Sequence, residues 1–188
     1  MPDCISCTQA KQSRKPFDPK SDMRCTNKGE LTHIDLWGKY DVTSINGHQY
    51  YLLLVDDATR YITVYFLKGK HEAPQHVKNY LTYLHIRGIS THAIRVDHGT
   101  EFVNKDLEEW CQTKGMEIQM TAPYSPSQNG VAERMNRTLV ELARAMISGS
   151  NLPEFLREQG IAHTAYIRNR SRTCGNLALP YGSYKAKI

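Results

Sequence analysis

The stretch YSPSQNGVAERMNRTLVELAR, residues 124–144, decides how this chain is interpreted. The S-x-x-Q pattern at 125–128, with a proline in the first turn, is typical of a helix start. Apolar side chains then recur at helical spacing and predict a long helix with one packed face. The members of that face are Val131, Met135, Leu139, Leu142 and Met146.

The polar side of this helix carries a carboxylate, Glu133, in its first turns. Asn129, Asn136 and Arg137 share that side, so amide and guanidinium groups flank the acid. Such a combination suits a metal ligand beside a phosphate chain. A solvated charged face on an amphipathic helix explains the same pattern. The helix alone does not distinguish this alternative from a metal site.

Composition indicates an ordinary globular chain that can accept a polyanionic partner. The 188 residues fit one domain with a core and a short extension, and 40% are hydrophobic. The net charge of +5 permits nucleic acid as a partner without demanding it. We expect no membrane segment, because no apolar run is long enough. Five cysteines, an odd number, favour a reduced, intracellular compartment.

Residues 1–28 are expected to form an extension outside the core. Cys4 and Cys7 form a C-x-x-C pair, followed by the basic stretch KQSRKPFDPK. Zinc takes four ligands, so the pair predicts the remnant of a zinc-binding module plus a linker, with Zn²⁺ bound only if further ligands lie upstream. A redox pair is the alternative, but it expects a strand before it and a helix after it.

The remaining patterns predict a core over 29–173 and an irregular tail over 174–188. Alternating or wholly apolar runs indicate strands, and apolar residues at helical spacing, closed by glycines, indicate helices. Strands joined by hairpins and then by helices give an α/β fold, a five-stranded mixed sheet with helices on both faces. The predicted strands are 31–38, 48–59, 60–69, 91–97 and 117–120; the helices are 72–87, 104–114, the long helix ending at Gly149, and 152–169, capped by Asn151.

Three acids occupy positions that suggest chemistry. Asp35 lies among apolar neighbours inside the first strand, Asp97 ends the fourth strand, and Glu133 is on the long helix. A carboxylate in a buried strand needs a compensating partner, and three that converge would repel one another unless cations lie between them. Oxygen ligands favour Mg²⁺ or Mn²⁺, and two such ions can promote displacement at phosphorus.

The spacing of these acids resembles a family signature. Residues 98–132 separate Asp97 from Glu133, which makes the pattern D-x(n)-D-x35-E. Together with HIDLWG, VDDATRY, VDHGTEF and AYIRNR, this pattern is similar to the integrase catalytic core of copia-type LTR retrotransposons, in the retroviral integrase superfamily. The resemblance extends over nearly the whole chain, including the K-x-x-R-x-P-F stretch after the C-x-x-C pair.

This resemblance implies an RNase H-like fold and a DDE site in which Asp35, Asp97 and Glu133 bind two Mg²⁺ or Mn²⁺ ions. The implied activity is 3′-end processing and strand transfer of retrotransposon DNA. The implied partners are element and target DNA and further copies of the chain, with the nucleus as the place of action. A related DDE transposase, an RNase H-like nuclease and a non-catalytic nucleic-acid-binding remnant stay open as alternatives.

Further residues are candidates for DNA contacts. Asn129, Asn136 and Arg137 are expected near phosphates because they share the side of Glu133. Tyr124 is expected to stack on an unpaired base, or alternatively to seal the hinge of a loop. The acidic pair at 56–57 is interpreted as a hairpin connection rather than as a second site.

Overall fold

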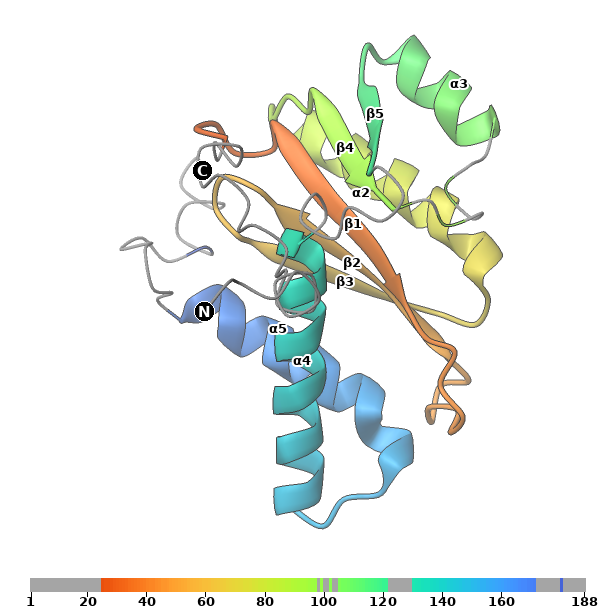
Figure 1. Cartoon of the computed structure of the whole chain (residues 1–188), viewed down its shortest axis with the longest axis vertical. Helices are drawn as coiled ribbons and strands as arrows, with labels where there is room; N and C mark the ends of the chain where they lie inside the picture. Colours follow the sequence, from red (N-terminus) through yellow and green to blue (C-terminus); the bar gives the residue numbers. More distant parts are fainter. Residues whose placement is uncertain are drawn as a thin grey trace, which may run out of the picture.

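Figure 1 shows the computed structural model of the chain, in which residues 25–97, 99, 102, 105–121, 130–171 and 180 are described. No helix within these residues combines the length and the apolar character that a membrane crossing needs. In chain order the elements are β1 (Leu31–Trp37), β2 (Tyr50–Asp56), β3 (Ile62–Leu67), η2 (Lys70–Glu72), α2 (Ala73–Ile86), β4 (Ala93–Val96), α3 (Lys105–Thr113), β5 (Glu117–Met120), α4 (Gly130–Gly149), η3 (Glu154–Leu156) and α5 (Arg157–Arg170).

The strands form one five-stranded sheet in the order β3-β2-β1-β4-β5. β1 and β3 pair with β2 in antiparallel fashion, while β4 pairs in parallel with both β1 and β5. Short connections can reverse a strand, whereas a parallel neighbour requires a crossover, here through α2 and α3. The predicted mixed sheet is confirmed; β5 has the predicted bounds, and the other four strands are somewhat shorter than predicted.

Helices cover both faces of the sheet, as predicted. On one face, Ile34, Leu52 and Leu54 belong to a core with residues of α2 and α3. On the other face, Tyr51 and Leu53 belong to a second core with residues of α4 and α5. Figure 1 shows α4 in front of the sheet and α2 behind it, and α5 packs against α4 and β3. The alternation along β1 and β2 therefore assigns each side chain to one of two cores.

The packed face of α4 differs from the predicted one. The residues it buries are Gly130, Ala132, Met135, Asn136, Leu139 and Ala143, whereas Leu142 remains 43% exposed. Large apolar side chains determined the predicted face, whereas the buried face also includes the small side chains of Ala132 and Ala143. The predicted start pattern at 125–128 lies outside the described residues.

The start of α5 was also predicted incorrectly. Asn151 has a positive φ of 51° and caps no helix. Instead, Pro153 is the extended N-cap of η3, and α5 follows at Arg157. Further along α5, a Cβ on Gly160 would lie 3.1 Å from Cδ1 of Ile147, so this glycine permits close packing against α4.

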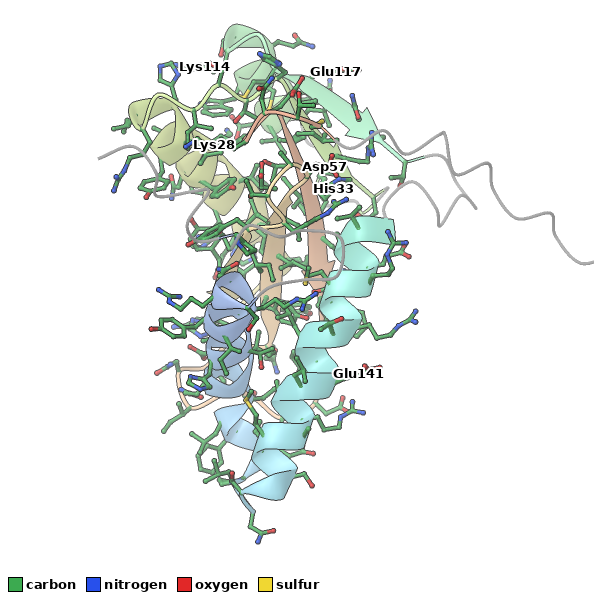
Figure 2. All side chains as sticks on the ribbon, turned by 90° about the vertical axis from the view of Figure 1, so that its left-hand side faces the viewer. Lys28, His33, Asp57, Lys114, Glu117 and Glu141 are labelled. Atoms are coloured by element: carbon green, nitrogen blue, oxygen red, sulfur yellow. The ribbon has the colours of Figure 1, made fainter. Side chains whose placement is uncertain are left out.

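The acids after β2 act structurally, in agreement with the hairpin interpretation. Asp56 accepts hydrogen bonds from the N–H groups of Gly29 (2.6 Å) and Thr59 (2.7 Å). Asp57 lies 3.0 Å from Nε2 of His33, and both side chains are buried (Figure 2). Burial works to raise the pKa of Asp57, but hydrogen bonds and positive neighbours hold it below its usual value. The pair thus anchors the segment before β1 to the β2–β3 turn.

Candidate metal centre

β1 and β4 bring two of the predicted acids together. Their parallel register sets Leu31 beside Ala93 and His33 beside Arg95. Asp35 and Asp97 each come two residues later, on the side of the sheet that carries His33 and Arg95, which is the side that α4 covers. Asp97 directly follows β4 and accepts a hydrogen bond of 3.1 Å from the N–H of Gly99.

The third predicted acid comes from α4. This helix contacts β1 and β2 and carries Glu133 in its first turn. Burial raises the pKa of Asp35 to about 6, although a hydrogen bond from Asn136 works to lower it. The negative charges of Asp97 and Glu133 raise that pKa as well. The three carboxylates are therefore close enough to interact electrostatically.

The acids have no cationic partner in the described part of the chain. No lysine, arginine or histidine there forms an ion pair with Asp35, Asp97 or Glu133. Nor do the described residues include a ready-made cluster of three or more metal-ligating side chains. An oxygen-only donor set with uncompensated negative charge fits Mg²⁺ or Mn²⁺, and such an ion would have to draw the carboxylates closer.

A buried hydrogen-bond chain fixes Asp35. Asn136 Nδ2 donates to Oδ2 of Asp35, and Tyr51 Oη donates to Asn136 Oδ1 over 2.8 Å. Both Asn136 and Tyr51 have no exposed surface. Burial raises the pKa of Tyr51, so its hydroxyl keeps the proton that it donates. Because the Tyr51 hydroxyl points at the amide oxygen, the amide nitrogen must face Asp35.

This placement corrects one sequence prediction and adds a residue. Asn136 does not fit the predicted role of a DNA contact, because its side chain is buried and committed to Asp35 and Tyr51. Tyr51 was not predicted at all. Its one signal in the sequence is a hydroxyl in a largely apolar strand. Tyr51 is two residues before Leu53, which pairs with Asp35, so both side chains of β2 lie on the face of Asp35.

The other predicted contacts stay predictions. Arg137 is exposed on α4, as a phosphate contact requires. Tyr124 and Asn129 lie outside the described residues, and so do Cys4 and Cys7 of the expected zinc half-site.

Two family models match the chain. Residues 26–126 match a model described as integrase core domain, and residues 114–159 match a second model with the same description. The first match includes β1–β5 and extends over Asp35 and Asp97, and the second includes Glu133.

Polyproteins of mobile elements are similar to the chain over most of its length. The retrovirus-related Pol polyprotein from transposon TNT 1-94 of Nicotiana tabacum is 34% identical over 169 residues, which cover 89% of this chain and 13% of that relative. The corresponding polyprotein from transposon RE1 of Arabidopsis thaliana is 30% identical, covering 90% of this chain and 11% of the relative. The chain thus spans only a small part of these relatives.

A solved structure shares the fold. It is a cryo-EM structure of the simian T-cell lymphotropic virus intasome in complex with PP2A regulatory subunit B56 gamma. The TM-score is 0.73 at 17% identity, and the alignment covers 97% of this chain and 63% of that chain. The predicted RNase H-like fold, with its five-stranded mixed sheet, is confirmed.

Proposed function

The chain belongs to the integrase core domain family, and we propose on this premise that it is the catalytic core of a copia-type retrotransposon integrase. Its activity is metal-dependent polynucleotidyl transfer, in two steps: 3′-end processing of the element's DNA and strand transfer into target DNA. The substrates are therefore element ends and target DNA, and the working form is a homo-oligomer in the nucleus.

One observation carries this proposal. Asp35 lies in a buried strand, although burial and the negative charges of Asp97 and Glu133 disfavour its ionised form. No basic side chain of the described residues neutralises the three acids. A protein retains such uncompensated repulsion where a cation compensates it in the working state. The family signature falls on the same three residues.

Asp35, Asp97 and Glu133 are the residues that would hold two Mg²⁺ or Mn²⁺ ions. Bound there, the ions would supply activation of the attacking oxygen and stabilisation of the leaving oxygen in an in-line displacement at phosphorus. The protein's own part is to orient the ligands. Asn136 keeps Oδ2 of Asp35 in one direction, and Tyr51 keeps Asn136 from turning its amide over.

The three acids are held by different kinds of element, two by the sheet and one by a helix. Asp35 lies in β1 and Asp97 directly follows the neighbouring parallel strand β4, so the backbone hydrogen bonds between these strands limit the distance between the two residues. Glu133 is exposed on the first turn of α4, directly after residues that are outside the described part. We infer that Glu133 completes the ligand set when DNA is bound.

A transferase and a nuclease of the same fold are distinguished by their products. Labelled element-end duplex is incubated with supercoiled plasmid, Mn²⁺ and the protein. Joined products support the integrase, whereas end-nicked or degraded DNA without joining supports the nuclease alternative. DNA binding with neither product supports the non-catalytic remnant. EDTA in place of Mn²⁺ is the control and abolishes both reactions.

The expected zinc half-site belongs to this proposal as well. Cys4 and Cys7 provide two of the four ligands of a structural zinc site, so we infer weak Zn²⁺ binding in this chain alone. A tight equimolar complex that Cys4→Ser abolishes would show that the remaining ligands lie within the chain.

A further inference from the structure

Part of the sheet face that carries Asp35 and Asp97 is not covered by the described helices. On that side α4 contacts β1 and β2, and α5 contacts β3. In Figure 1 neither helix extends over β4 and β5. The uncovered positions are polar: Arg95 and Gln119 are half-buried, and Glu117 is exposed.

These three side chains form a hydrogen-bonded row. Arg95 pairs with Gln119 in the β4–β5 register, and its Nη2 and Nε donate to Oε1 of Gln119 over 2.8 and 3.3 Å. Nε2 of Gln119 in turn donates to Oε2 of Glu117 over 3.2 Å. The amide orientation is thereby set from both sides, and the guanidinium group is held over β5 (Glu117 is labelled in Figure 2).

The position of Arg95 makes this arrangement informative. Arg95 is two residues before Asp97 on the same face of β4 and beside His33, itself two residues before Asp35. An arginine so placed is within reach of neutralising the catalytic acids. It forms no ion pair with any acid of the described residues, because a neutral amide holds it instead.

We propose that Arg95 binds a phosphate of the DNA strand that leads to Asp35 and Asp97, with Gln119 holding the guanidinium in position. This inference rests on the proposed function. A guanidinium has five N–H donors, of which Gln119 takes two, so donors remain for a phosphodiester. The planar fork suits phosphate oxygens, and a positive charge beside the acids offsets the repulsion between them and the DNA backbone.

The alternative is that Arg95 only bridges β4 and β5, and the salt dependence of DNA binding distinguishes the two. Each phosphate contact contributes about 0.9 to the slope of log affinity against log salt. Loss of one contact makes the drop in affinity between 50 and 200 mM NaCl about 3.5-fold smaller. We compare the unmutated chain with Arg95→Gln, using a 30-base-pair duplex and fluorescence anisotropy. Arg87→Gln is the charge-matched control, since Arg87 is exposed at the end of α2, on the other face of the sheet.

The expected result is a smaller salt slope for Arg95→Gln, recovery of the slope in Arg95→Lys, and no change for Arg87→Gln. If Arg95→Gln unfolds, the side-chain Nε–H resonance of Arg95 in the unmutated chain provides the readout. It should shift on adding duplex, and that of Arg87 should not. An unchanged slope, or an unshifted Arg95 resonance in a chain that binds DNA, would overturn this inference alone. Failure of the unmutated chain to bind DNA would overturn the proposed function as well.

Discussion

Replacing Asp35 by asparagine should stabilise the metal-free protein at neutral pH. Burial and the neighbouring acids raise the pKa of Asp35 from 3.8 to about 6. The folded state therefore holds this proton more tightly than the unfolded state, so the carboxyl stabilises the fold at low pH. That stabilisation is lost as pH rises from about 4 through about 6, and the loss amounts to about 3 kcal/mol in total.

Asparagine cannot ionise, but it keeps the size of the side chain and one acceptor for Nδ2 of Asn136. Asp35 also accepts from the Leu36 N–H, and losing one such bond costs about 1 kcal/mol. We therefore expect Asp35→Asn to raise the free energy of unfolding by about 2 kcal/mol at pH 7. At pH 4 only about 0.5 kcal/mol of the electrostatic cost is present, so the lost hydrogen bond should leave the variant less stable by about 0.5 kcal/mol. The low pKa of Asp57 makes both proteins less stable in acid, and this effect cancels in the difference.

The assay is urea unfolding followed by circular dichroism, in EDTA, at both pH values. Glu141→Gln is the control, because Glu141 is exposed on α4 (Figure 2) and forms no ion pair in the described part of the chain. Adding Mn²⁺ should stabilise the unmutated chain and leave Asp35→Asn nearly unchanged. A stability difference that is the same at pH 4 and pH 7 would refute the electrostatic account of Asp35.

Two further predictions concern the neighbours of Asp35. Tyr51→Phe removes the hydrogen bond to Oδ1 of Asn136 in the core, so the free energy of unfolding should fall by about 1–3 kcal/mol. The amide resonances of Asn136 should also broaden or double. The control variant Tyr65→Phe should show neither change. Sharp, single Asn136 resonances in Tyr51→Phe would argue against the positioning role. Glu133→Gln should lower both end processing and strand transfer by at least about 100-fold while DNA binding persists, whereas Glu141→Gln should retain both activities. Loss of DNA binding along with activity would make Glu133 structural instead.

Most of the fold could be predicted because its signals are local. The apolar run YYLLLVD and the alternating ITVYFL are recognisable as strands, and they pair as β2 and β3. Where several local signals compete, prediction failed. Asn151 matches a capping pattern, but Pro153 two residues later fixes the extended backbone from which η3 begins.

The site was predictable only for residues whose chemistry is unusual in their surroundings. An acid inside a buried strand, as at Asp35, is conspicuous in any sequence. Asn136 and Tyr51 are not conspicuous, because their roles depend on contacts between distant parts of the sequence. Tyr51 is 85 positions from Asn136, and Asp35 is 101 positions from it. Arg95 was missed for the same reason, since its partner Gln119 is specified by the β4–β5 register. Alanines at 132 and 143 also weigh little in an apolar pattern, although they form part of the packed face of α4.

The central claim is that Asp35, Asp97 and Glu133 form one two-metal centre. A crystal structure with MnCl₂ and element-end DNA, analysed by the anomalous scattering of manganese, tests it most directly. The account predicts two Mn²⁺ peaks about 3.5–4 Å apart, bound by these three carboxylates. Well-ordered carboxylates that stay more than about 10 Å apart, with manganese absent or bound elsewhere, would contradict it.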